Sequence, residues 1–298
     1  MEAIDHGNNI HIYKIEILQH ISAETYTLFL NRLAKKLPPK MLRKLYYSRL
    51  GSRLVKIYDN VNKHNTKLEV YEARHGFKIY VSPAAPGERA IIYNAYEPEV
   101  MALFTSLLQE GSIVFDIGAW IGNYTLLAAT KAKQVIALEI NPDNVIRIRK
   151  NISLNEGFDK IITVLNIGAS NTKTLAALDK RKSRLMDRVV VNMPEGKIDA
   201  ENALRLDTLD NIAVNLGIKH IDLLIMDIEA HEIYALEGMR DLLSNKAIKH
   251  LIIEVHPKFL HEIGKMDTEV IQILEKSGYN VEIFNKESEA AYHIHAYF

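Results

Sequence analysis

From residue 113 onward, apolar runs of strand length alternate with segments of helix length. The runs lack the polar alternation of a half-exposed strand, which indicates strands that are covered by helices on both faces. Strands separated by single helices are typical of βαβ units and a parallel sheet. The expected strands lie at 113–119, 134–141, 161–169, 221–230 and 250–257, and the expected helices lie at 123–132, 142–155, 232–245 and 265–278.

Two later features complete this α/β pattern. The strands expected at 280–284 and 292–298 are separated by only a few residues. A parallel crossover needs a dozen or more residues, so we predict an antiparallel hairpin. Residues 171–220 interrupt the alternation, and the extra strands expected at 188–194 and 203–212 suggest an inserted flap near the working edge of the sheet.

The first 95 residues follow a different pattern. Helices are expected at 22–37 and 41–61, and a hairpin is expected at 67–83, with His75 and Gly76 at its turn. We therefore predict an N-terminal helical and β-hairpin extension, residues 1–95, packed on a main domain, residues 96–298.

Composition narrows the functional classes. The 298 residues are 48% hydrophobic, which allows a sizeable core and one or two domains. The chain has no cysteine, which excludes disulfides, thiolate metal sites and cysteine nucleophiles. The 37 basic and 37 acidic residues balance, whereas proteins that grip nucleic acid over a wide surface usually carry a basic excess. With no apolar run near the roughly 20 residues needed to cross a bilayer and no signal-peptide pattern, we expect a cytoplasmic protein.

The stretch VFDIGAWIGNYT, residues 114–125, places Asp116, Gly118 and Gly122 at the end of a strand and before a helix. Glycines there let a ligand approach the backbone, and such loops line the ligand crevice of open sheets. The pattern is D-x-G-x-x-x-G, whereas an NAD enzyme uses G-x-G-x-x-G. Asp116 would repel a pyrophosphate and suits a cationic amino-acid group. A glycine turn that merely packs is the alternative.

The next strand ends in Glu139, about 20 residues beyond the glycines. A carboxylate at this place can accept hydrogen bonds from both hydroxyls of a ribose. A solvated glutamate at the end of a strand is the alternative. The spacing from the glycine loop favours the ribose.

These motifs, together with ALEINPDNVIRIRKNISLN, LRLDTLDNI, IDLLIMDIEAHEIYALEGM and LIIEVHP, resemble the FkbM-type S-adenosylmethionine-dependent methyltransferase family over about residues 95–298. The resemblance implies a Rossmann-like class I fold, with a seven-stranded, mostly parallel sheet and a C-terminal antiparallel hairpin. It also implies S-adenosyl-L-methionine as cofactor. The cofactor-binding residues that it implies are Asp116, Gly118, Ala119, Gly122, Asn123, Glu139, Ile140, Asn166, Ile167, Gly168 and Asp227.

The chain departs from the family's pattern at two places. Met226 stands where the family commonly has a lysine, before the aspartate of the fourth strand. Ala230 stands where it commonly has the glycine of D-x-E-G-x-E, which suggests a different backbone approach beside the substrate.

Methyl transfer from a sulfonium to a hydroxyl requires alignment, exclusion of water and removal of a proton. We predict catalytic roles for Asp227, Glu229 and His256, which lie at the ends of the fourth and fifth strands. His231 and Glu232 are also candidates, and the alternative is that they simply begin the next helix.

No metal is expected. Asp227, Glu254 and His256 offer hard oxygen and imidazole ligands, but no dense ligand spacing is visible in the sequence. His261, His293 and His295 are expected to be surface or packing residues.

The preferred acceptor is the hydroxyl of a glycan, a lipid-linked sugar or a small metabolite, by analogy with the family. RNA methylation is the runner-up, although Asp227-Ile-Glu-Ala lacks the Pro-Pro-aromatic motif of enzymes that methylate base amines. A non-catalytic binding module is a third hypothesis. Residues 32–56 carry nine basic and no acidic side chains, which suggests docking on an acidic domain or weak contact with an anionic partner. We expect no specific nucleic-acid partner, and the sequence predicts no oligomeric state.

Overall fold

The computed structural model describes residues 41, 48–49, 67–73, 75–82, 84–92, 95–179, 188–190, 203–285 and 291–298. The chain forms two units, one with residues up to 74 and 81–98, the other with residues 75–80 and 99–298. The helices expected at 22–37 and 41–61, and the basic segment 32–56, fall outside the described residues apart from 41, 48 and 49.

Both strands expected within 67–83 are present. They are β1 (Glu69–Glu72) and β2 (Lys78–Val81), and Gly76 between them adopts a φ of 86°. Glycine tolerates this conformation because it has no Cβ. A short helix, α5 (Pro86–Ile92), follows.

The central sheet of the larger unit has seven strands in the order β12-β13-β11-β10-β3-β4-β5. All neighbours are parallel except β13, which is antiparallel to β11 and β12. The predicted Rossmann-like class and its C-terminal antiparallel hairpin are confirmed. The strands are β3 (Ile113–Ile117), β4 (Gln134–Leu138), β5 (Ile162–Leu165), β10 (Ile221–Met226), β11 (Ile248–Val255), β12 (Asn280–Phe284) and β13 (Tyr292–Tyr297).

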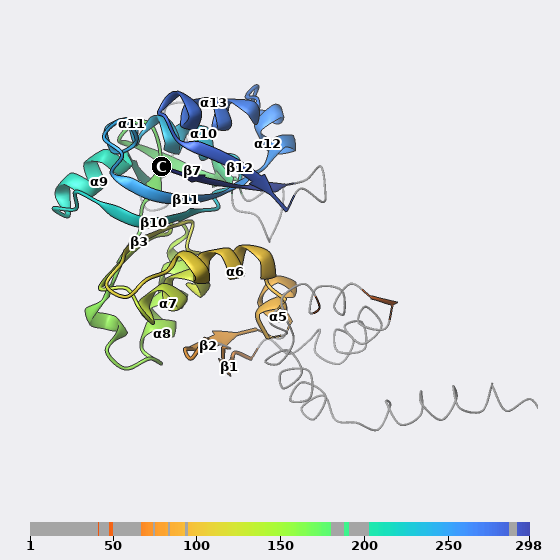
Figure 1. Cartoon of the computed structure of the whole chain (residues 1–298). Helices are drawn as coiled ribbons and strands as arrows, with labels where there is room; N and C mark the ends of the chain where they lie inside the picture. The colour runs from red at the N-terminus through yellow and green to blue at the C-terminus, as the bar shows by residue number, and fades with distance from the viewer. Residues whose placement is uncertain are drawn as a thin grey trace, which may run out of the picture. The chain divides into compact units, whose positions relative to one another are not determined.

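Helices cover both faces of this sheet. Figure 1 shows α7 (Asn123–Ala129) and α8 (Pro142–Ile152) on one face, and α9, α10, α11 and α13 on the other. The remaining bounds are α6 (Pro98–Leu107), η1 (Phe158–Lys160), α9 (Leu209–Asn215), α10 (Glu232–Glu237), α11 (Arg240–Ser244), α12 (Pro257–Glu262) and α13 (Thr268–Lys276). Within the described part of the chain, none of these helices combines the length and apolar character that a membrane span requires.

The helix expected at 232–245 is wrong as a single element, because it breaks at Gly238 into α10 and α11. A Cβ on Gly238 would lie 1.9 Å from the carbonyl oxygen of Ser170, so two backbones approach each other closely there. A further helix, α12, was not predicted; it begins at Pro257, a favourable first helical residue.

Strand alternation decides which side chains face which helices. Phe115, Ile117 and Met226 belong to the apolar core shared with α9, α10, α11 and α13. Asp116 lies between Phe115 and Ile117 in the strand, so its side chain points to the opposite face of the sheet, where it contacts Thr125 of α7. The carboxylate therefore lies at the carboxyl end of the sheet, on the face covered by α7 and α8.

A second sheet contains β6 (Gly168–Ala169), β7 (Thr174–Asp179), β8 (Arg188–Val190) and β9 (Leu204–Asp207), in the order β6-β9-β7-β8. It provides strands at 188–190 and 204–207, whereas the rest of the stretch 203–212 enters α9 because Thr208 caps that helix and accepts a hydrogen bond from Asn211 N. The single strand expected at 161–169 is also wrong, since it divides into β5 and β6. The role of 171–220 as a flap stays a prediction.

Candidate functional site

The loop between β3 and α7 turns on three residues with left-handed backbone. Gly118, Trp120 and Gly122 have φ angles of 85°, 48° and 91°. A Cβ on Gly118 would lie 1.9 Å from the carbonyl oxygen of Asp227. Glycine is therefore required at 118 both by conformation and by the close approach of the chain that leaves β10.

Two backbone bonds hold the start of this loop to the neighbouring strand. Gly118 N and Ala119 N both donate to the carbonyl oxygen of Leu138, over 2.9 and 3.0 Å. From the other side, the fully buried Asn151 of α8 donates its Nδ2 to Ile121 O over 2.7 Å. The loop is thus fixed from both flanking elements before any ligand binds.

Asp116 is buried at the end of β3. Burial raises the pKa of Asp116 to about 6, although hydrogen bonds from the Thr125 side chain and backbone lower it, and the charge of Asp227 raises it further. The Thr125 hydroxyl donates to Asp116 Oδ2. A cationic group that bound beside Asp116 would favour its ionised form.

Glu139 ties the glycine loop to the segment after β4. Its Oε2 accepts from Trp120 N and its Oε1 accepts from Asn141 N, both over 2.7 Å. Burial raises the pKa of Glu139 to about 7, while these two backbone bonds lower it. The Asn144 side chain also hydrogen-bonds Glu139, so three of the four lone pairs of the carboxylate are used and one is left for a further donor, such as a ribose hydroxyl.

Asn123, the first residue of α7, supplies a donor at the same place. Its side chain is buried, and its Nδ2 has no acceptor among the residues that the structure describes. A buried amide group without an acceptor is costly, so this donor suits a ligand that carries a carboxylate or another acceptor. The loop and Glu139 therefore offer a donor, an acceptor and an anion.

The segment 166–168 has a positioning role in the structure. Asn166 Nδ2 donates to the carbonyl oxygens of Glu139 and Ile140, over 2.9 Å each, so this amide interrupts the strand expected at 161–169 and fixes the end of β4. A Cβ on Gly168 would lie 2.7 Å from a Leu206 methyl and 2.9 Å from Ile140 Cδ1. Packing thus explains the glycine at 168, and the roles of Ile140, Ile167 and Gly168 beside a cofactor stay predictions.

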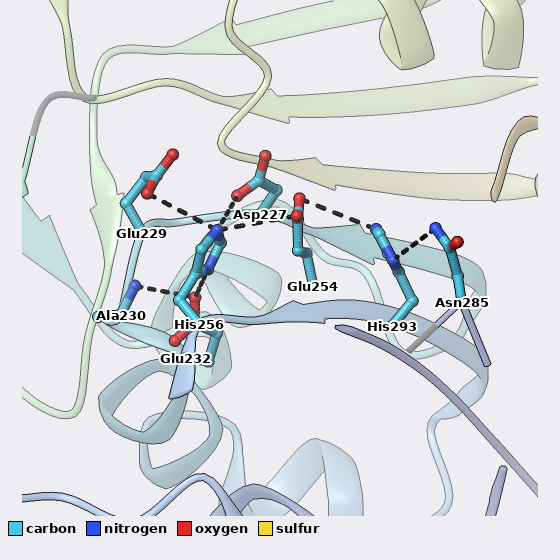
Figure 2. A network of polar contacts seen from close by, with 8 residues as sticks. All are labelled: Asp227, Glu229, Ala230, Glu232, Glu254, His256, Asn285 and His293. Carbon is cyan, nitrogen blue, oxygen red and sulfur yellow. Dashed lines mark hydrogen bonds and ion pairs between the residues drawn. The ribbon is translucent and has the colours of Figure 1, made fainter. Parts of the chain in front are cut away.

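A second group of polar side chains gathers where β10 and β11 end (Figure 2). The ring of His256, directly after β11, lies among carboxylates from three chain segments. His256 Nε2 is 3.6 Å from Glu229 Oε2 and 3.8 Å from both Asp227 Oδ1 and Glu254 Oε1. The structure therefore brings together Asp227, Glu229 and His256, the three residues predicted to be catalytic.

Glu232 orients this imidazole. It is fully buried at the start of α10, and its Oε1 accepts from Ala230 N and pairs with His256 Nδ1, both at 3.0 Å. Glu232 thus begins a helix and also contacts the cluster, and a catalytic role for it stays a prediction. His231 Nε2 instead lies 3.0 Å from Ser170 Oγ, and burial lowers its pKa to about 4.

The electrostatics of the cluster follow from its carboxylates. Burial alone would lower the pKa of His256, but the hydrogen bond with Glu232 and the charges of Asp227 and Glu254 outweigh burial and raise it to about 10. In the ligand-free protein His256 is therefore a cation at neutral pH. Burial and the charge of His256 lower the pKa of His293 to about 4, so that ring is neutral.

Sequence reasoning missed three supporting residues. Thr125 lies inside the quoted glycine motif, and Asn151 occupies a buried position beside Ile148 and Ile152 on α8, where a polar residue signals a specific bond. His293 was expected at the surface or in packing, and it is buried with its Nε2 at 3.8 Å from Glu254 Oε2. Only the pairing of β11 with β13 brings it there.

The loop between β10 and α10 is strained at two residues. Glu229 and Ala230 have φ angles of 53° and 76°, which residues other than glycine rarely adopt. Ala230 is the position at which the resemblance expects glycine. The chain keeps the glycine-type backbone there and carries a methyl group on it.

Comparisons with known proteins identify the family. The FkbM methyltransferase domain matches residues 116–281, more than half of the chain. The chain is 24% identical over 186 residues to the hexuronic acid methyltransferase AglP of Haloferax volcanii, a match that covers 59% of this chain and 72% of that protein. It is 29% identical over 119 residues to the tRNA (guanine(37)-N(1))-methyltransferase Trm5b of Pyrococcus abyssi, over 40% of this chain and 28% of that enzyme.

Among solved structures, the methyltransferase FkbM from Methylobacillus flagellatus superposes with a TM-score of 0.45 and 14% identity, covering 83% of this chain and 60% of that one. The chain thus spans less than two thirds of that structure and of the tRNA enzyme. The family match confirms the resemblance drawn from the glycine loop and the strand ends. The chain belongs to the FkbM methyltransferase domain family, and it is a methyltransferase.

Proposed function

We propose that the chain uses S-adenosyl-L-methionine to methylate an oxygen atom of a sugar or glycan. Bound S-adenosylmethionine would supply an electrophilic methyl group on a sulfonium. Three features of the site support this cofactor: the free acceptor on Glu139, the buried donor of Asn123 and the anionic Asp116. They match the hydroxyls, carboxylate and ammonium group of such a molecule.

One observation carries the proposal for the acceptor. The backbone of Asp227 packs against Gly118 of the cofactor loop, while its carboxylate joins Glu229, Glu254 and His256. An acceptor hydroxyl next to Asp227 would therefore lie close to both the methyl donor and a proton acceptor. General-base removal of such a proton typically contributes about 10²–10⁴-fold to a rate.

Each residue of the cluster has a proposed task. Asp227 accepts the proton of the hydroxyl, and Glu229 orients the sugar through its other hydroxyls. His256, held by Glu232 through Nδ1, keeps the carboxylates together by its charge. The strained backbone of Glu229 and Ala230 projects the carboxylate of Glu229 to this side of the sheet.

A sugar is favoured over RNA on charge. Four carboxylates gather around His256, where the acceptor would bind: those of Asp227, Glu229, Glu232 and Glu254. Carboxylates repel the phosphates of a nucleic acid. The relative AglP acts on a hexuronic acid by its name, which supports a sugar acceptor. The relative Trm5b acts on tRNA by its name, so RNA remains the alternative that the experiment must separate.

Product analysis tests this proposal. The protein is incubated with methyl-labelled S-adenosylmethionine and either hexuronate-containing sugars and glycans or total tRNA, and label is located by mass spectrometry. We expect label on a sugar oxygen, at least 100-fold less product with Asp227→Asn, and wild-type yield with Asp241→Asn, an exposed aspartate of α11. Label on a tRNA base would overturn the sugar proposal, and cofactor binding without any product would favour a non-catalytic module.

A further inference from the structure

We propose that Asp227, Glu254 and His256 bind a divalent cation, with Glu229 beside them, and that this cation holds the acceptor oxygen. The inference rests on the proposed function for the identity of the acceptor, but the binding site itself does not. It revises the expectation that the chain binds no metal, which rested on sequence spacing alone.

The three side chains converge on one point in space. One ligand atom each from Asp227, Glu254 and His256 lies within 4.8 Å of the others. His256 Nε2 is 3.8 Å from an oxygen of Asp227 and 3.8 Å from an oxygen of Glu254, which is too long for hydrogen bonds. Mg²⁺ and Ca²⁺ bind ligands at about 2.0–2.6 Å, so neighbouring ligand atoms around one ion are separated by about 3–4 Å.

The orientation of His256 is an independent observation. Its side chain is only 7% exposed, and its Nδ1 is fixed at 3.0 Å from the fully buried Glu232. Its Nε2 points at the carboxylates and makes no hydrogen bond within the described part of the chain. A histidine that ligates a metal almost always donates its other N–H to a carboxylate or a carbonyl, which is the arrangement of Glu232 and His256.

Asp227 supplies a matching acceptor. Its Oδ1 is a buried atom with no hydrogen-bond donor among the described residues, and it is the same atom that faces His256 Nε2. A buried oxygen without a hydrogen-bond donor is costly. A cation at this point would satisfy Asp227 Oδ1 and His256 Nε2 together.

Charge favours a cation with two positive charges. Four carboxylates surround one imidazole, so even a protonated His256 leaves the ionised cluster with a net charge of −3. An oxygen-rich set with one imidazole suits Mg²⁺ or Mn²⁺. The same cation would pair with the single carboxylate of an anionic sugar, which the four carboxylates otherwise repel, whereas an RNA strand brings many phosphates to the same edge.

The cation changes the proposed proton transfers in two respects. His256 binds it as the neutral imidazole, so the Nε2 proton is released to solvent when the cation binds. An acceptor hydroxyl bound to it would lose its proton more easily, as water does on a bound metal ion. With Asp227 engaged as a ligand, the proton passes to Glu229, whose Oε2 is 3.6 Å from His256 Nε2.

Binding of Mn²⁺ to the full chain without cofactor tests the site. We expect one saturable Mn²⁺ per chain by electron paramagnetic resonance, with ¹⁴N modulation from one imidazole in the pulsed spectrum. Glu254→Gln and Asp227→Asn should each weaken Mn²⁺ binding at least tenfold, and His256→Gln should remove the ¹⁴N signal. Glu275→Gln, an exposed glutamate of α13, is the matched control and should bind as the wild type does.

Circular dichroism and thermal melting establish that each variant folds. If His256→Gln does not fold, the effect of Glu254→Gln on Mn²⁺ binding still tests the site. Absence of saturable Mn²⁺ binding, or binding unchanged by Glu254→Gln and Asp227→Asn, would overturn the site. Sugar methylation that persists at full rate in EDTA would also overturn it while leaving the proposed function intact. Mn²⁺ bound at the site without any sugar methylation would support the site and reject the proposed function.

Discussion

The carbonyl oxygen of Asp227 occupies the space that a Cβ on Gly118 would need, with only 1.9 Å between the two atoms. This contact joins the cofactor loop after β3 to the acceptor cluster after β10. A change at either residue is therefore transmitted to the other without passing through a ligand.

Gly118→Ala should destabilise the protein and abolish cofactor binding, because alanine would have to keep a φ of 85° and displace Asp227. Gly157→Ala is the control, since Gly157 has a φ of 80° but no atom within 4 Å of its Cβ position. The left-handed backbone costs both variants about 1 kcal/mol of unfolding free energy. In Gly118→Ala, urea denaturation should find a free energy of unfolding that is lower by at least a further ~2 kcal/mol, because overpacking in a core costs about 1–3 kcal/mol. Equal free energies of unfolding for the two variants would mean that the overlap with Asp227 is relieved at no cost.

Glu139→Ala should weaken binding of S-adenosylhomocysteine at least tenfold, because a charge-assisted hydrogen bond to the ribose, of about 1.5–3 kcal/mol, is lost. The variant should also lose stability, since Trp120 N and Asn141 N lose their acceptor. Asp143→Asn, an exposed acid in the first turn of α8, is the control and should leave affinity unchanged. Calorimetry that finds wild-type affinity in Glu139→Ala would remove Glu139 from the cofactor site.

Ala230→Gly should be better tolerated than Ala235→Gly, although both delete a buried methyl group. Ala230 has a φ of 76°, so glycine relieves strain of about 1–2 kcal/mol there. Ala235 lies in α10, where glycine costs about 0.5–1 kcal/mol. By thermal and urea unfolding, the free energy of unfolding of Ala230→Gly should exceed that of Ala235→Gly by at least about 1 kcal/mol. The opposite order would show that the backbone of Ala230 does not destabilise the folded chain.

Asp116 should make the ligand-free protein less stable as pH rises from about 4 to 6. Its pKa is raised from 3.8 to about 6 on folding, so the folded state binds the proton more tightly. The stability that this proton adds is fully present below pH 3.8 and is lost as pH rises through 6. Asp116→Asn has no such proton, so wild type should lose about 2–3 kcal/mol relative to the variant between pH 4 and 7.

That comparison is made by urea denaturation at several pH values without cofactor. Glu139 titrates in the same range, and the charge of Asp116 raises its pKa, so both proteins carry Glu139→Gln and the titration of Glu139 drops out of the difference. A difference that does not change with pH would mean that Asp116 titrates normally in the folded chain.

Much of the proposed cofactor site could be predicted from the sequence, because local spacing determines where its residues lie. The glycine loop, Glu139 and the helix start at Asn141-Pro142 lie within about 30 residues, and strand alternation with capping rules fixes their order. The seven-stranded sheet follows from the same alternation. Its terminal hairpin follows from the short connection between the last two strands.

The acceptor cluster was predicted as candidates at the ends of the fourth and fifth strands, without the contacts between them. Asp227, Glu254 and His256 meet because β10 and β11 are parallel neighbours, and sequence spacing does not fix which strands pair. The hydrogen bond between Glu232 and His256 joins residues that are 24 positions apart. Local patterns also do not predict the break at Gly238. There the close approach to Ser170 divides a helix that periodicity predicts to be continuous.

The most direct test of this account is a titration of the full chain with S-adenosylhomocysteine and, separately, with NAD, followed by calorimetry and thermal melting. We predict that S-adenosylhomocysteine binds once per chain and stabilises the folded state by about 2.7 kcal/mol at a hundred times its dissociation constant, whereas NAD does neither. Equal or greater stabilisation by NAD, or no binding of S-adenosylhomocysteine, would contradict the assignment of the loop from Asp116 to Asn123, together with Glu139, as the site of the methyl donor.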